Sequence, residues 1–65
     1  MQESLFVLEL KLEMKREALR VLLEERFGEL PADLLGQIEA VTDMAKIDEL
    51  FRAAVRVRRP EKLPF

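Results

Sequence analysis

The chain has 65 residues, 49% of them hydrophobic, a net charge of −2, and neither cysteine nor histidine. A chain of this length forms one domain, and its core contributes only a few kcal/mol unless disulfides, a metal or a partner add to it. The missing cysteines exclude disulfides and thiolate sites, and the missing histidines remove the commonest metal ligand and general base. We therefore predict one small helical domain, residues 1–65, that is cytoplasmic and gains stability by self-association.

A long first helix is predicted from about residue 4 to residue 27. This segment has no Gly or Pro and is dominated by Leu, Glu, Lys, Arg, Met and Ala, the strong helix formers. Ser4 is suited to cap its N-terminus. Apolar and polar residues also alternate with a period of two across residues 5–14, so a β-strand is the alternative for that segment.

The apolar residues of this helix fall on two faces about 160° apart at 100° per residue. The first face contains Leu5, Leu8, Leu12, Leu19 and Leu23. The second contains Val7, Leu10, Met14, Ala18 and Val21. A helix with so wide an apolar arc must be covered from two directions.

Charged residues on the first helix are spaced for pairing along its surface. Glu13 precedes Arg16 by three residues, and Glu17 precedes Arg20 by three. Opposite charges at this spacing are neighbours on a helix and stabilise it by a few tenths of a kcal/mol each. Both pairs are predicted to form.

A glycine and a proline predict the corner after the first helix. Gly28 follows Phe27 and suits the left-handed position that ends helices, and Pro31 suits the first turn of a second helix over about 31–41. Thr42 is a candidate N-cap for a third helix over about 43–58, which Pro60 should bring to an end. The expected fold is all-α, an oligomeric helical bundle.

Two short helices can cover only the C-terminal half of the long one. Residues 1–16 are therefore predicted to be an extension for oligomerisation, and a homodimer is favoured because two-fold dimers are the commonest assembly. The predicted interface consists of Leu5, Val7, Leu8, Leu10, Leu12, Met14 and Val21. No contact with a membrane is expected, since no apolar run approaches the roughly 18–20 residues of a spanning helix.

Residues 17–63 resemble a bacterial domain of unknown function. The pattern is a leucine-rich helix ending in Arg-Phe-Gly, then Leu-Pro, Ile-Glu-Ala and a last amphipathic helix. Its signature residues are Arg26, Phe27, Gly28, Leu30 and Pro31. Members of that family are found C-terminal to Rpn-type, transposase-like proteins with a PD-(D/E)XK nuclease fold, so the resemblance implies a role accessory to a nuclease-like domain.

The sequence predicts no catalytic, cofactor-binding or metal-binding residues. Glu9-Leu10-Lys11 matches half of a PD-(D/E)XK site, but too few residues precede it to form the strand that carries the other acidic residue. The only hydroxyl side chains, Ser4 and Thr42, stand at cap positions without a base. We therefore predict that the chain is not an enzyme and needs no cofactor.

Positive charge is concentrated near the C-terminus. Residues 1–50 carry 6 Lys and Arg against 12 Asp and Glu, whereas residues 51–65 carry 5 against 1. The leading prediction is a non-catalytic helical module for interaction and oligomerisation. The alternative is a nucleic-acid-binding accessory domain that contacts phosphates through four arginines, Arg52, Arg56, Arg58 and Arg59.

Overall fold

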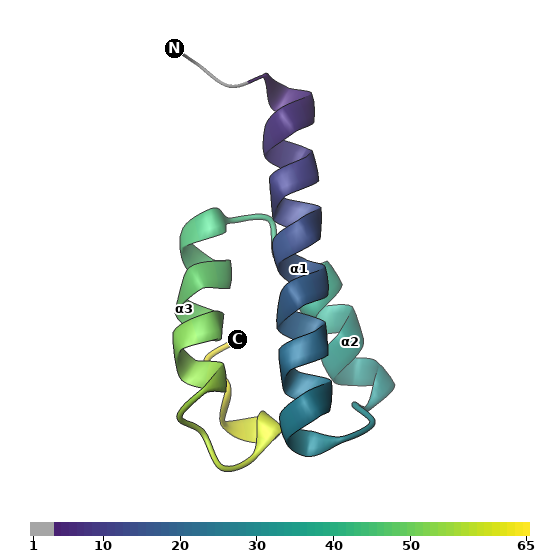
Figure 1. The fold of residues 1–65 in the computed structure, drawn as a ribbon, viewed down its shortest axis with the longest axis vertical. Coiled ribbons are helices and arrows are strands. Elements are labelled where there is room, and N and C mark those ends of the chain that lie inside the picture. Colours follow the sequence, from purple (N-terminus) through teal and green to yellow (C-terminus); the bar gives the residue numbers. More distant parts are fainter. Residues whose placement is uncertain (1–3) are drawn as a thin grey trace.

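A computed structural model describes residues 4–65, and every regular element in this part of the chain is a helix. Helix α1 spans Leu5–Phe27, α2 Ala32–Glu39 and α3 Met44–Ala54, and a short 3₁₀ helix, η1, spans Pro60–Lys62. The predicted all-α class is confirmed, and the alternative of a strand at residues 5–14 is wrong. Helices α2 and α3 flank the C-terminal part of α1, whose N-terminal turns extend beyond both of them (Figure 1).

Helix α1 begins and ends where its local signals indicated. The Ser4 hydroxyl accepts a hydrogen bond from the Val7 amide at 3.2 Å, as a capping side chain does. At the other end Gly28 has a φ of 80°, a conformation that costs glycine little, and its amide donates to the Glu24 carbonyl at 2.8 Å. Residues 1–3 of the predicted extension lie outside the described residues.

Helix α2 is shorter than predicted and stops at Glu39. Pro31 is its N-cap residue and Asp33 lies in its first turn, where a negative charge is favourable. The chain then turns inward, because the Val41 side chain is buried and its amide donates to the Ile38 carbonyl at 3.2 Å. Val41 therefore belongs to the core rather than to the helix.

Helix α3 differs from its prediction at both ends. Its N-cap is Asp43, whose carboxylate accepts from the Ala45 amide at 2.9 Å, and not Thr42. The helix ends at Ala54, four residues before the predicted end at residue 58. The amides of Arg56 and Val57 both donate to the Ala53 carbonyl. The helix therefore ends in a turn several residues before Pro60, and Pro60 does not determine where it ends.

The three helices enclose one hydrophobic core. Leu19, Leu23, Ile38, Ile47 and Leu50 have virtually no exposed surface. The tail after α3 closes the open end of this core, because Leu63 is buried against it and the Lys46 ammonium group donates to the Pro64 carbonyl. The core thus draws on all three α-helices, the loops between them and the tail, but it covers only part of α1.

Gly36 lies in the middle of α2 without a packing reason to be glycine. A methyl group at this position would meet nothing within 4 Å, and the backbone conformation is helical. Gly36→Ala should therefore raise the free energy of unfolding by about 0.5–1 kcal/mol, because alanine loses less conformational entropy in a helix. Urea denaturation followed by circular dichroism measures the change, and an unchanged or lower stability would contradict it.

Gly28→Ala is the matched control for that experiment. Gly28 also has open space around it, but its positive φ strains any residue that has a Cβ atom. The same substitution should therefore lower stability at the corner and raise it in α2.

Candidate interaction surface

Most of the exposed large apolar side chains among residues 4–65 lie on α1. We call this set the α1 apolar surface, and it consists of Leu5, Phe6, Val7, Leu8, Leu10, Met14 and Val21. Six of these seven side chains lie within the first ten residues of the helix. Contiguous apolar patches on a soluble protein usually mark a site of interaction.

Part of this surface continues the core. Along the core-facing side of α1 the exposed fraction rises from 8% at Leu12 to 41% at Leu8 and 74% at Leu5. The cause is length, because α2 and α3 end before they reach the first turns of α1 (Figure 1). Leu12 was predicted to be an interface residue, but the chain's own core covers it, so we leave it out of the surface.

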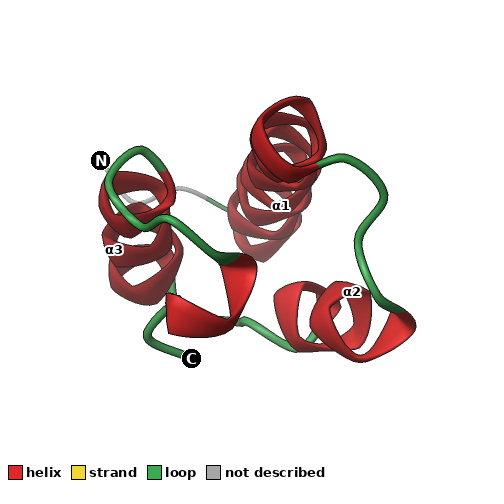
Figure 2. Ribbon diagram, turned by 90° about the horizontal axis from the view of Figure 1, so that it is seen from below, coloured by secondary structure: helices red, strands yellow, loops and turns green. Residues whose placement is uncertain are grey.

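The other part faces away from the core. Val7, Leu10, Met14, Ala18 and Val21 lie on the outer side of α1, and we call this set the back stripe. Seen along the bundle, α2 and α3 both lie on the inner side of α1 and leave its outer side uncovered (Figure 2). Each back-stripe residue is exposed, with Met14 reaching 63%.

Phe6 is an interface candidate that was not predicted from the sequence. Its side chain is 73% exposed, although phenylalanine is normally buried. It lies on neither predicted apolar face, since the helical spacing places it among the acidic residues. Its exposure in the structure identifies it, whereas the periodic spacing of apolar residues does not.

A groove runs beside the back stripe. Its floor is apolar and comes from Leu10, Met14 and Ala18. Its rim is acidic and comes from two turns of α1 and from the end of α2, with Glu13, Glu17 and Glu39. None of the described residues forms a cluster of three or more carboxylates placed to hold a metal ion, so the groove combines an apolar floor with a diffuse negative charge.

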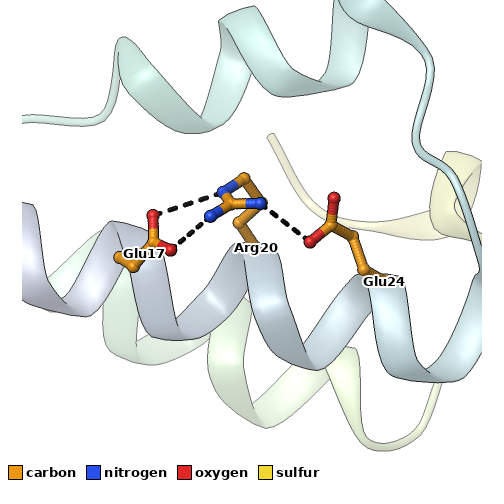
Figure 3. A network of polar contacts seen from close by, with 3 residues as sticks. All are labelled: Glu17, Arg20 and Glu24. Atoms are coloured by element: carbon orange, nitrogen blue, oxygen red, sulfur yellow. Dashed lines mark hydrogen bonds and ion pairs between the residues drawn. The ribbon is translucent and has the colours of Figure 1, made fainter.

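Charged residues pair with one another along one side of α1. The Arg20 guanidinium lies between Glu17 and Glu24, with Nε 3.3 Å from the Glu17 Oε2 atom and Nη1 2.8 Å from the Glu24 Oε1 atom (Figure 3). The hydrogen bond with Glu17, followed by the charges of Glu17 and Glu24, raises the pKa of Arg20. The predicted Glu17–Arg20 pair is confirmed, and Arg20 keeps its charge at any pH that the fold tolerates.

Lys15 ties α1 to α3 on the other side of the helix. Its ammonium group lies 2.7 Å from the Asp48 carboxylate. Both side chains are about 40% exposed, so solvent screens the attraction, and its main effect is to set the lateral position of α3.

Arg16 has a role that the sequence did not reveal. It was predicted to pair with Glu13, but its Nε and Nη2 atoms both donate to the Val41 carbonyl, with Nε at 2.8 Å. That carbonyl stands between α2 and α3, where the backbone has no helical partner. Arg16 therefore fixes the loop that joins the two short helices.

Removing the Arg16 donors should cost about 1.5–3 kcal/mol of stability, because hydrogen bonds from charged groups are strong and the carbonyl would lose its partner. Arg16→Met keeps the length and apolar stem of the side chain and removes both donors. Chemical denaturation of this variant measures the loss. Arg16→Lys keeps one donor group, so its stability should lie between those of Arg16→Met and the natural protein. Equal stability of all three proteins would contradict this role.

The signature residues meet at the lower corner of the bundle. Leu30 is buried, Pro31 precedes α2, and the Arg26 guanidinium lies 4.7 Å from the centre of the Phe27 ring. Arg26 also donates to the carbonyls of Ala54 and Val57, the latter at 2.9 Å. Cations are favoured at helix C-termini, so Arg26 caps α3 from another helix.

The four C-terminal arginines lie at the end of α3 and in the turn that follows it. All four side chains are exposed. No carboxylate among residues 4–65 forms an ion pair with Arg52, Arg56, Arg58 or Arg59. They form a solvated positive area at the end of the bundle opposite to the protruding turns of α1.

Within the described residues, no helix combines the length and the apolar character needed to cross a membrane. Comparison of the chain with family models, with curated proteins and with solved structures gives no match.

Proposed function

We propose that this chain is a non-catalytic, cytoplasmic self-association module whose contact surface is the α1 apolar surface. The observation that carries the proposal is the protruding end of α1, where apolar side chains lie on nearly every side of the helix. A helix that is apolar all round is normally buried. A second copy of the chain offers the same surface and can cover it.

The energetics favour this proposal. Covering half of a leucine, phenylalanine or methionine side chain contributes about 1 kcal/mol or more. A two-fold interface uses each side chain that it covers twice, once from each copy. A chain of 65 residues also gains directly, because association stabilises only the folded state.

Sedimentation equilibrium of the whole chain tests the proposal. At a protein concentration of ~100 μM, a dissociation constant of about 1 μM gives mainly dimers. A folded monomer at that concentration, with the helical content that circular dichroism reports for the fold, would overturn the proposal.

In a larger protein, the module would pair or tether nuclease-like domains. This part of the proposal follows from the resemblance of residues 17–63 to the C-terminal domain of Rpn-type, transposase-like proteins. Fusing the chain to a monomeric nuclease domain provides the test, because the fusion should sediment as a dimer and the isolated nuclease domain should not.

A second candidate function is binding of nucleic acid through the four C-terminal arginines. The specific observation in its favour is that all four are exposed and none has an ion-pair partner in the described part of the chain. Phosphate contacts release counterions, so such binding would weaken steeply with salt. Fluorescence anisotropy with labelled DNA and RNA at about 50 mM salt decides the matter, and absence of binding removes this candidate.

A further inference from the structure

We infer that two copies of the chain pair with their α1 helices parallel and in register along the back stripe, so that each stripe residue meets its own counterpart. This inference rests on the proposed self-association and adds its geometry. It states that the contact uses the outer side of α1 rather than the core-facing side, and that the two α1 helices are parallel rather than antiparallel. Three observations carry it, namely the spacing of the stripe, the unequal charge of its two flanks, and the acidic groove.

The spacing of the stripe suits a two-stranded helical pair. Val7, Met14 and Val21 are seven residues apart, and Leu10 follows Val7 by three. A seven-residue apolar repeat keeps the contact on one side of a helix. Val7 with Leu10 three residues later matches the pattern that favours parallel dimers, whereas Glu17 and Glu24 follow Met14 and Val21 at the same spacing. The stripe is about 21 Å long at 1.5 Å per residue. Glu25, one turn after Val21 and exposed, ends it.

The two flanks of the stripe carry opposite charges. At 100° per residue, Lys11 and Lys15 lie about 80° to one side of its centre, and Glu13 and Glu17 about 80° to the other. Within the chain, Lys15 also pairs with Asp48 and Glu17 with Arg20. Glu39 adds a third carboxylate on the acidic side, where it lines the groove. The basic flank is therefore distinct from the acidic flank in every copy.

This difference selects the orientation. In a parallel pair the acidic flank of each helix meets the basic flank of its partner, and in an antiparallel pair each flank meets its own copy. The parallel arrangement brings Glu13 within two residues along the axis of both lysines of the partner, about 3 Å of rise. The antiparallel arrangement brings carboxylates together and lysines together, which is unfavourable.

The groove fits what the partner would place there. A lysine side chain has an apolar stem and a charged end, and it packs its stem on apolar surface while its ammonium group stays near charge and water. The groove offers an apolar floor and an acidic rim. Both short helices lie on the inner side of α1, so neither blocks the approach of a second copy along the outer side (Figure 2).

Single cysteines test the orientation cleanly, because the natural chain has none. In a parallel dimer, Val7→Cys and Val21→Cys should each form a disulfide-linked dimer with itself under mild oxidation of the folded protein. In an antiparallel dimer neither variant should link alone, but a mixture of the two should. Met14→Cys, at the middle of the stripe, should link in both arrangements and reports whether the stripe is the contact at all. Gln37→Cys, exposed on α2, is the control that should stay unlinked.

The outcomes separate this inference from the proposed function. Self-linking of both valine positions supports it. Linking only in the mixture overturns the parallel orientation, and a dimer by sedimentation that links at none of the three positions overturns the stripe while self-association stands. A monomer by sedimentation overturns both. Circular dichroism of each variant before oxidation confirms that it is folded.

A charge reversal gives an independent measurement. Glu13→Lys should weaken the dimer about threefold to tenfold at low salt and less at high salt, because it faces the partner's basic flank. Glu61→Lys makes the same change in net charge at η1, away from the stripe, and should leave the dissociation constant unchanged. An equal effect of both substitutions, or tighter association of Glu13→Lys, would contradict the parallel arrangement.

Discussion

Replacing Met14 by glutamate should convert the assembly into folded monomers. Met14 lies at the centre of the back stripe and is 63% exposed in the single chain. In the dimer the new carboxylate would be buried against an apolar partner and, in the arrangement inferred above, beside its own copy. Burying an unpaired charge costs several kcal/mol, so we expect the dissociation constant to rise at least about 100-fold.

Two controls distinguish a lost interface from a lost fold. Met14→Leu keeps an apolar side chain of similar volume and should leave association nearly unchanged. Gln37→Glu adds a negative charge at an exposed position of α2 and should also leave association unchanged. Sedimentation equilibrium gives the association state and circular dichroism the helical content. A dimeric Met14→Glu protein with native helical content would place the contact elsewhere.

Ile47→Ala should have the largest effect on stability. Ile47 has no exposed surface and joins α3 to the core formed with α1 and α2. Truncating a buried isoleucine costs about 2–5 kcal/mol through lost burial and the cavity left behind. A single core of this size contributes only a few kcal/mol, so the variant should be largely unfolded in dilute solution at 25 °C.

The concentration dependence of this effect is part of the prediction. Association stabilises the folded state, so raising the protein concentration should recover helical content in Ile47→Ala. Val55→Ala is the control, because Val55 is 62% exposed and its truncation should cost well under 1 kcal/mol. Thermal unfolding of both variants at several protein concentrations measures their stability. Equal midpoints for the two variants would contradict the assignment of Ile47 to the core.

Local patterns carried enough information to predict the helices and the corner. The apolar spacing at Leu19 and Leu23, the glycine at position 28 and the proline at position 31 each act within a few residues, so the sequence shows them directly. The same holds for the exposed end of α1, which follows from unequal helix lengths.

Contacts between residues far apart in the sequence could not be predicted from such local patterns. The guanidinium groups of Arg16 and Arg26 bind backbone carbonyls 25 and 28 residues away, and nothing near either arginine indicates the partner. The end of α3 was missed for the same reason, since Pro60 is the visible signal and Arg26 holds the carbonyls where the helix stops. Phe6 shows a related limit, because exposure depends on where the other helices end.

Arg16 and Arg26 of α1 together constrain the length of α3. Arg16 holds the carbonyl just before α3 begins and Arg26 holds the carbonyls where it finishes. They are ten residues apart, about 15 Å along α1, and the eleven residues of α3 span about 16 Å. Inserting or deleting one residue within α3 would shift its far end by about 1.5 Å and turn it by 100°, and only one of the two attachments could then be kept. The length of the third helix is thus set by the first.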